Sequence, residues 1–251
     1  MYASVVLTPA ASKRLIAKGV AALPVVRSAL QSGRIIVTLG TTNAVVAEEL
    51  LGHPIDRGAF AAGFIDTRWN VNRRFGEAAE VVLQDGREVE MTGDSALSSL
   101  AAGDVLLKGG NALDPWGSVG VLMAATTGGT VGRYVAPALA RGVDIVIPIS
   151  VAKSVHTSIA ELSLQMGVGR LALHDGLPCG MYPLSGQVIS EIEALEFLFA
   201  VHAIHVASGG VGPGTGSVSL LLEGEDDAVR AAHAFVGALD EEQAVELSGT
   251  A

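Results

Sequence analysis

Short apolar runs alternate with amphipathic stretches along most of the chain. From about Ala10 to Gln31 the apolar residues recur at helical spacing, and Pro24 breaks or kinks the predicted helix. The β-branched run Ile35–Leu39 is a predicted strand, and Ala44–Leu51 is a predicted helix that Gly52 closes. These segments place a strand, a turn and a helix in direct succession.

The same order recurs in the middle of the chain. We expect strands at Val105–Leu107, Val119–Ala125 and Val143–Ile149, with a helix at Val131–Arg141 between the last two. Strands joined by a crossover helix are normally parallel. The expected fold class is therefore α/β, with a mainly parallel, Rossmann-like sheet that carries helices on both faces.

Several shorter segments extend this plan. The further predicted strands are Ala59–Ile65, Glu80–Leu83, Glu88–Met91 and Arg170–His174, and the further predicted helices are Ser95–Ala102 and His156–Met166. Asp85-Gly86 favours a hairpin turn between the second and third of these strands. Asp94 is expected near a helix N-cap. Thr67–Gly76 is interpreted as a polar loop and a candidate lid, and Asp175–Gly186 as a loop.

The pattern changes after residue 186. A helix from Gln187 to about Ala200, strands at Ala203–Ala207 and Ser217–Leu222, and a helix at Asp226–Leu239 are expected. This order fits a small layered unit or the antiparallel edge of the sheet. We therefore expect an α/β ligand-binding domain at residues 1–186 and a smaller α+β unit at residues 187–251, either separate from the first or continuous with it.

Composition narrows the classes of partner. The chain has 251 residues, of which 49% are hydrophobic, and a formal net charge of −10, which argues against nucleic acid or an anionic membrane as partner. The single cysteine, Cys179, favours a reducing cytoplasm, and we expect neither a leader nor a membrane span. Only 17% of residues are charged and the mean hydropathy is +0.46, so we expect a homo-oligomer, most simply a dimer.

Glycine-rich turns follow several of the predicted strands and carry the candidate chemistry. The candidate ligand-binding residues are Gly40, Thr41, Thr42 and Asn43 in the first turn, Gly109, Gly110 and Asn111 in the second, and Gly128, Gly129, Thr130 and Arg133 in the third. Helix N-termini have unpaired N–H groups and a positive dipole end, so we expect one cleft that binds a small anionic molecule. A fourth turn, residues 209–216, is expected to be a hairpin loop.

Each turn also has a purely structural interpretation. Thr42, Asn43 or Thr130 could simply cap a helix, and Lys108 could be a solvated turn lysine. On the functional interpretation Lys108 is a candidate catalytic residue, with Asp66 or Asp114 as its carboxylate partner. No set of histidines and carboxylates has the spacing of zinc ligands, and we expect neither a metal nor another cofactor.

The segments Leu39–Ala44 and Leu106–Leu113 resemble the superfamily of ribose-5-phosphate isomerase, glucosamine-6-phosphate deaminase and CoA transferases. The resemblance implies the fold and an anionic ligand that Thr41, Thr42 and Lys108 contact. The chain departs from the isomerases at Gly93–Leu97, which holds one aspartate where they have an acidic pair, and at Trp116–Ser118, where they have an acid. We therefore do not interpret the chain as an isomerase of that type.

Three functions remain open at this point. The first is an enzyme, an isomerase or transferase that acts on a phosphorylated or carboxylated metabolite such as a sugar phosphate, a CoA ester or an organic acid. The second is a metabolite sensor without turnover. The third is a structural assembly protein whose glycines serve close packing.

Overall fold

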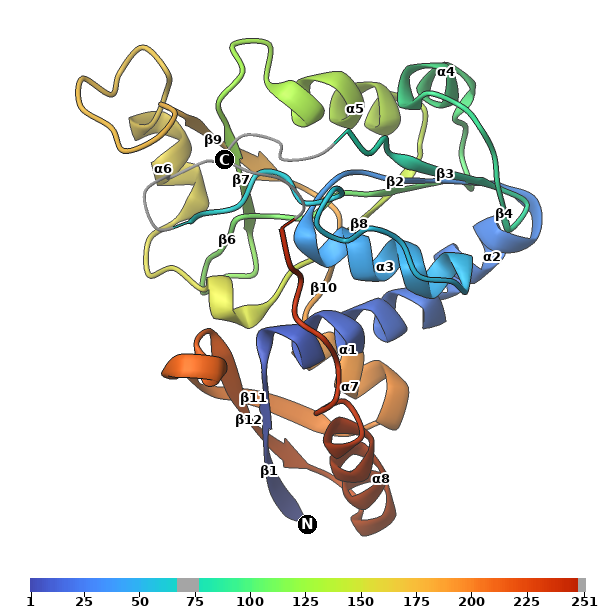
Figure 1. Ribbon diagram of the computed structural model, residues 1–251, viewed down its shortest axis with the longest axis vertical. Helices are drawn as coiled ribbons and strands as arrows, with labels where there is room; N and C mark the ends of the chain where they lie inside the picture. The colour runs from blue at the N-terminus through green and yellow to red at the C-terminus, as the bar shows by residue number, and fades with distance from the viewer. Residues whose placement is uncertain (67–76, 248–251) are drawn as a thin grey trace.

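The computed structural model describes residues 1–66 and 77–247, and its centre is a six-stranded sheet (Figure 1). In spatial order the strands are β10 (Gln187–Ile189), β8 (Asp144–Pro148), β5 (Val105–Leu107), β2 (Arg34–Val37), β3 (Val81–Gln84) and β4 (Arg87–Glu88). The first four strands are mutually parallel, and β3 and β4 add an antiparallel edge. The molecule is therefore a mixed α/β protein, and its central sheet is mostly parallel.

Helices pack on both faces of this sheet, because alternate side chains of a strand point to opposite sides. Ile35 and Val37 belong to one buried cluster, whereas Ile36 belongs to the other. The first cluster includes residues of α1 (Pro9–Ala22), α2 (Pro24–Ser32), α3 (Thr41–Leu51) and α7 (Glu191–Phe199), and the second includes residues of α4 (Gly93–Ser99) and α5 (Gly129–Ala140). The expectation of two covered faces is confirmed.

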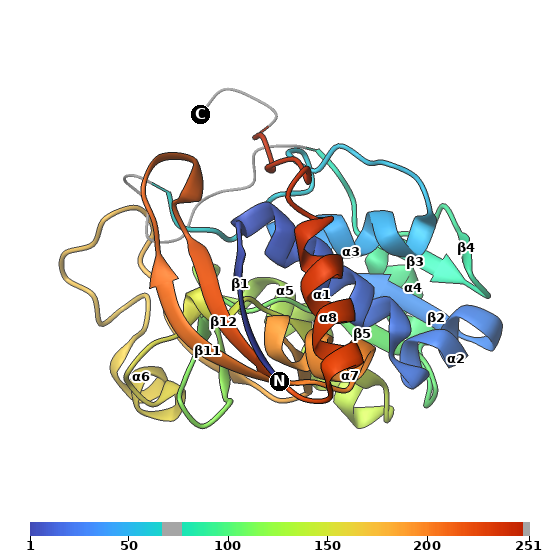
Figure 2. The same ribbon diagram turned by 90° about the horizontal axis from the view of Figure 1, so that it is seen from below.

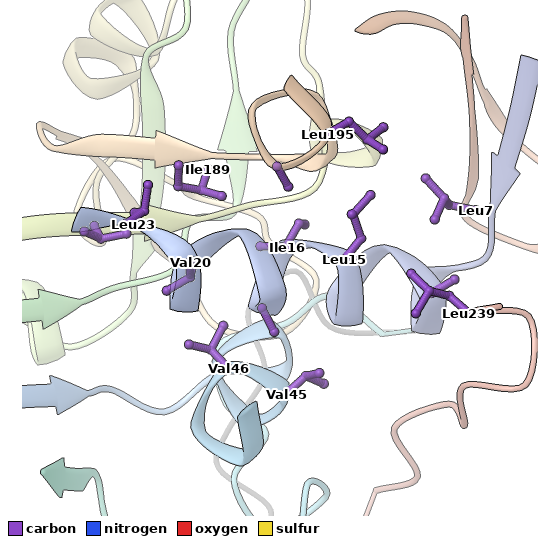
Figure 3. Packing of buried hydrophobic residues seen from close by; sticks show 14 of the residues in the cluster. Leu7, Leu15, Ile16, Val20, Leu23, Val45, Val46, Ile189, Leu195 and Leu239 are labelled. Carbon is purple, nitrogen blue, oxygen red and sulfur yellow. The ribbon is translucent and has the colours of Figure 1, made fainter. Parts of the chain in front are cut away.

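Helix α1 lies between α3 and α7 and is buried on both sides (Figure 3). Its residues Leu15, Ile16 and Val20 are fully buried. A Cβ atom at Gly19 would lie 2.6 Å from the Cβ of Ala194, so α1 and α7 approach closely at this glycine. The predicted break in the first helical segment is confirmed, because α2 begins at Pro24.

A smaller antiparallel sheet lies beyond α1 and α7 (Figure 2). Its strand order is β1 (Tyr2–Leu7), β12 (Ser217–Glu223) and β11 (His202–Gly209), and α8 (Asp226–Gly237) packs against it. The fourth glycine turn joins β11 to β12, which confirms a hairpin loop. One cluster of buried residues includes side chains of β1, β12 and α8 as well as β2. The C-terminal unit thus takes one strand from the N-terminus, while β10 joins the central sheet.

A third sheet corrects two expectations. It consists of β6 (Ala112–Leu113), β7 (Val119–Met123) and β9 (Gly180–Leu184), all antiparallel. The predicted strand at Val119–Ala125 exists, but its place in the parallel sheet was wrong, because an apolar run does not specify its partner. The predicted loop Asp175–Gly186 contains β9, which precedes β10. The helix of this region, α6, spans Ile159–Gln165.

Other expectations were wrong at particular segments. Ala59–Ile65 is not a strand, because its backbone forms local turns in which Ala61 N–H donates to the Gly58 carbonyl. Arg170–His174 is an irregular, largely exposed segment. Residues 187–189 form a strand instead of the start of a helix, since Ser190 caps α7 with the help of Glu193. Asp94 lies in the first turn of α4, near the N-cap residue Thr92, as expected.

The hairpin between β3 and β4 is confirmed. Asp85 and Gly86 both have positive φ, at 50° and 74°, as a type I′ turn requires. The candidate lid Thr67–Gly76 lies outside the described residues. Within the described ranges no helix is long and apolar enough to cross a membrane.

Candidate functional site

A pocket of about 380 Å³ lies at the carboxyl edge of the central sheet. The segments that follow β2, β5 and β8 form its wall, together with the start of α5. Its lining includes Gly40, Thr41, Thr42, Asn43, Lys108, Gly109, Gly110, Asn111, Gly128, Gly129, Thr130 and Arg133. Three turns that are distant in sequence thus meet at one concave surface, where open α/β sheets characteristically bind ligands.

The first turn begins α3 without a side-chain cap. Gly40 is the N-cap residue at φ 155°, and its N–H donates to the Phe60 carbonyl at 3.0 Å. The alternative that Thr42 or Asn43 caps the helix is therefore wrong. Because the first N–H groups of an α-helix have no intrahelical partner, this turn presents the positive end of α3 to the pocket.

Asn43 connects the ends of two strands. Its amide Nδ2 donates to the Thr38 carbonyl at 2.8 Å and to the Leu107 carbonyl at 3.3 Å. The side chain is 1% exposed, and its Oδ1 has no hydrogen-bond partner among the described residues. The ends of β2 and β5 are therefore held together beneath the pocket, and one buried polar atom there is left unsatisfied.

Two lysine side chains line the pocket. Lys108 Nζ donates to the Gly109 carbonyl at 3.0 Å, and Lys153 Nζ donates to the Gly110 carbonyl at 2.7 Å. The Lys108 residue is 9% exposed, so it is not a solvated turn lysine. Neither ammonium group forms an ion pair with a carboxylate of the described chain. Among the described residues, the direct hydrogen-bond partners of both ammonium groups are therefore backbone carbonyls, and Glu191 acts on Lys153 without an ion-pair contact.

Burial and the charge of a neighbouring lysine lower the pKa of each of these amines. Burial, and next the charge of Lys153, lowers the pKa of Lys108 to about 8. Burial and the charge of Lys13 lower the pKa of Lys153 to about 8, against the opposing effect of Glu191. An incoming anion would favour the charged form of both groups.

Lys153 was not predicted from the sequence, although a signal for it exists. It ends the 3₁₀ turn Val151–Lys153, which follows β8 as Lys108 follows β5. Glu191, which is fully buried, fixes this turn by accepting hydrogen bonds from Ser150 Oγ at 2.5 Å and Val151 N–H at 2.9 Å. The rule that strand ends face the ligand applies equally to both lysines.

The two glycines of the second turn differ in their surroundings. A Cβ atom at Gly110 would lie 2.2 Å from Val119 Cγ1, so this glycine is required for packing. A Cβ atom at Gly109 would meet nothing closer than the Pro148 carbonyl oxygen at 3.5 Å. Both ends of the Asn111 amide form hydrogen bonds within the protein. Its Nδ2 donates to the Gly63 carbonyl, and its Oδ1 accepts from Leu122 N–H.

The third turn presents a second helix N-terminus to the same pocket. Gly128 is the N-cap residue of α5 at φ 81°, and no side chain caps the helix, so the capping alternative for Thr130 is wrong. Arg133 lines the pocket, but its charge is compensated by ion pairs with Glu80 and Asp94. The lysines therefore supply the positive charge of the pocket that has no carboxylate partner among the described residues.

The two aspartates that were expected near Lys108 do not line the pocket. Asp114 Oδ1 accepts hydrogen bonds from the N–H groups of Trp116 and Ser118, and Oδ2 from that of Ile159. Burial raises the pKa of the Asp114 carboxyl, but these donors outweigh it and hold the pKa below its ordinary value. Asp66 is half-buried at the end of the described segment. Glu80, which was not predicted, is the carboxylate among the described lining residues.

Comparisons with known proteins identify no relative of the chain. No family model, curated protein or solved structure matches it. Within the described residues no group of histidine, cysteine and carboxylate side chains is arranged to hold a metal ion. The functional argument therefore rests on the geometry and charge of the pocket.

Proposed function

We propose that this protein binds a small anionic metabolite, of the class of sugar phosphates, CoA esters and organic acids, in the pocket at the carboxyl edge of the sheet. The observation that carries the proposal is the presence of Lys108 and Lys153 in one pocket without a carboxylate partner among the described residues. A buried positive charge is costly unless an opposite charge accompanies it. A bound anion supplies that charge.

Two further features support an anionic ligand. The uncapped N-termini of α3 and α5 both belong to the pocket, and each offers unpaired N–H groups to an anion. Lysine contributes a point charge, which suits phosphate and carboxylate groups alike. The proposal includes the Rossmann-like fold of the superfamily that Leu39–Ala44 resembles, a cytoplasmic location and a homo-oligomeric state.

Conversion of the ligand is a second candidate function. It is favoured by the lowered pKa of Lys108, because perturbed lysines concentrate at catalytic sites. A sensor or assembly role without turnover is the alternative, and it is favoured by the positions of Asp66 and Asp114 away from the pocket lining. Product analysis with each ligand that binds separates the two.

Binding is tested by thermal-shift screening of the full chain against sugar phosphates, CoA esters, organic acids and inorganic phosphate. A ligand at 100 times its Kd adds about 2.7 kcal/mol to stability. The Lys108→Ala and Lys153→Ala variants are expected to weaken binding at least tenfold by calorimetry. Lys18→Ala is the matched control, because Lys18 pairs with Glu49 outside the pocket.

The outcome that contradicts the proposal is equally specific. If the screen yields an anionic ligand whose affinity is the same in wild type, Lys108→Ala and Lys153→Ala, the pocket is not its site. Unfolding of the two variants in the absence of ligand shows whether each remains folded. Inorganic phosphate serves as the simplest probe, since it carries the anion alone.

A further inference from the structure

The distribution of lysine in this chain is unusual. Of its sixteen basic residues twelve are arginines, and the lysines are Lys13, Lys18, Lys108 and Lys153. Lys108 and Lys153 line the pocket, and the charge of Lys13 acts on Lys153. Arginine stays charged at any physiological pH, whereas lysine readily loses its proton when buried. The site therefore uses the one cationic side chain that can also become a nucleophilic amine.

Both pocket amines are held on neighbouring carbonyl groups of one turn. Lys108 Nζ donates to the carbonyl of Gly109 and Lys153 Nζ to that of Gly110, so the amines share the same wall. The fully buried Glu191 favours the charged form of Lys153. No carboxylate of the described residues contributes in this way to Lys108. Both amines have a pKa of about 8, so the assignment of roles rests on position. Glu191 bonds to the turn that carries Lys153, which places a carboxylate near Lys153 as the cation and leaves Lys108 as the candidate nucleophile.

We propose that Lys108 forms an imine with an aldehyde or ketone that carries an anionic group, while Lys153 and the helix N-termini hold the anion. The proposal rests on the anion-binding function above and extends it to the chemical class of the substrate. The Nζ lone pair attacks the carbonyl carbon, and the carbonyl oxygen takes up the proton that leaves Nζ. Loss of water then forms the C=N bond.

Electrostatics makes the amine available near neutral pH. A pKa of about 8 in place of 10.5 increases the neutral fraction of Lys108 at pH 7 about 300-fold. A neighbouring cation and desolvation are the two established means by which proteins activate a lysine nucleophile, and Lys108 has both. The other charged groups around this wall are Lys13, Glu191 and the ion-paired Glu80 and Arg133.

Borohydride trapping tests the imine directly. The wild-type chain is incubated at pH 7.5 with glycolaldehyde phosphate, which has an aldehyde and a phosphate, and sodium borohydride reduces any imine to a stable secondary amine. Peptide mass spectrometry then locates the adduct. We expect one adduct per chain on Lys108, with Lys18 and the N-terminal amine as internal controls for non-specific reaction. Excess inorganic phosphate or ethyl phosphate is expected to suppress the adduct.

Variants separate the roles of the two lysines. Lys108→Arg retains the charge and is expected to abolish the adduct, whereas Lys153→Arg keeps the neighbouring cation and retains it. Lys153→Met is expected to slow adduct formation at least tenfold at pH 7.5 and to shift the pH dependence of the rate to higher pH. Lys18→Arg is the matched control and is expected to react as the wild type does.

The inference and the proposed function fail in different ways. An adduct spread evenly over the lysines and the N-terminus, or located on Lys153 alone, overturns the assignment of Lys108. Absence of an adduct while ethyl phosphate still stabilises the wild type overturns imine formation and leaves anion binding intact. Absence of stabilisation by any phosphate or carboxylate probe overturns the proposed function itself. The position of the adduct is determined on the wild-type chain alone. Misfolding of a variant therefore does not affect the assignment of the reacting lysine.

Discussion

Among single residues, Lys108 has the clearest consequence for stability. Its pKa is about 8 in the folded chain against an ordinary value of 10.5, so the unfolded chain binds the proton more tightly. Stability from this group therefore rises as the pH increases from about 8 to 10.5, and its destabilising effect is fully present below pH 8. Without ligand, Lys108→Met should be more stable than wild type at pH 7, by on the order of 3 kcal/mol at most.

Urea unfolding of wild type and Lys108→Met at pH 7 and pH 10 measures this effect. The difference between the two proteins should shrink as the pH rises, while the Lys18→Met variant should show no comparable change. A difference that is independent of pH would mean that the charge of Lys108 is already compensated in the folded chain. Comparing variants at each pH removes the contributions of other titrating groups.

The sequence identified individual site residues when they belonged to a recognisable turn. Thr41, Thr42 and Lys108 follow strands that were predicted correctly, and their convergence follows from the parallel arrangement of β2 and β5. Lys153 lies four residues beyond the end of the predicted strand Val143–Ile149 and has no glycines beside it. Glu80 reaches the pocket from the segment before an antiparallel strand, and no local pattern indicates such a position.

Among the elements, the turn after β5 offers a matched pair of substitutions. Gly110→Ala would place a Cβ atom 2.2 Å from Val119 Cγ1 and 3.0 Å from Ile149 Cδ1, and such overpacking costs about 1–3 kcal/mol. At Gly109 the nearest atoms to an added Cβ lie at 3.5 and 3.8 Å. Gly109→Ala should therefore leave the free energy of unfolding within about 0.5 kcal/mol of wild type.

Chemical denaturation compares the two glycine variants directly. Equal stability of both would mean that the packing between β7 and the turn relaxes around a methyl group. The Gly109→Ala variant has a second use, because the added methyl group lies at the lining of the pocket. Because Gly109→Ala is expected to keep the wild-type stability, a change in its ligand affinity would reflect the added methyl group alone.

A cluster of charged side chains fastens the C-terminal segment to α1 and α3. Glu48 is 6% exposed and bonds to Arg14 at 2.8 Å and to Arg57 at 2.7 Å, and Glu242 pairs with both arginines. Burial raises the pKa of Glu48, but its bonds to Arg57, to the Ile55 N–H and to Arg14 outweigh burial and lower it. Stability from Glu48 is thus present above pH 4.5 and is lost as the pH falls through its folded pKa.

Removing the charge of Glu48 should destabilise the chain strongly. Glu48→Gln leaves two arginines partly uncompensated, and breaking a buried pair costs about 3–5 kcal/mol. Glu49→Gln is the control: Glu49 is 23% exposed, and more exposed pairs contribute about 1 kcal/mol or less. Urea unfolding at pH 7 and pH 3.5 should show a large gap between the variants at pH 7 that narrows in acid. A small effect of Glu48→Gln at pH 7 would contradict this role.

The elements that the sequence specified are those with strong local signals. The break before Pro24, the Asp85-Gly86 hairpin and the strand–turn–helix order all depend on nearby residues and were predicted. Strand partners depend on the whole chain, and for this reason β7 was assigned to the wrong sheet. The segment Ala59–Ile65 resembles a strand because it is largely apolar, and Phe60 and Ala61 are indeed buried. The N–H groups of Phe60 and Ala61 nevertheless donate to the nearby carbonyls of Asp56 and Gly58.

At the scale of the whole molecule, the N-terminal strand β1 shows what the sequence pattern did not predict, namely a strand and its distant partner. Strand β1 pairs with β12, more than two hundred residues away in sequence, and its side chains Val5 and Leu7 are buried. Alternation over so few residues is a weak signal for a strand, and nothing local indicates its partner. The same core joins β1 and α8 to the central sheet through α1, so the pocket and the C-terminal unit share one packed interior.

The association state is the last prediction at this scale. Only 17% of the residues are charged, compared with about 25% in typical soluble domains, and the mean hydropathy is +0.46. Several large apolar side chains are exposed on the isolated chain, among them Val6 at 61% and Val206 at 62% on the C-terminal sheet. Burial of such apolar surface against an identical chain favours association, and closed dimers are the commonest homo-oligomers. Light scattering at micromolar concentration should therefore give twice the mass of 25.6 kDa, and a monomer mass there would refute the prediction.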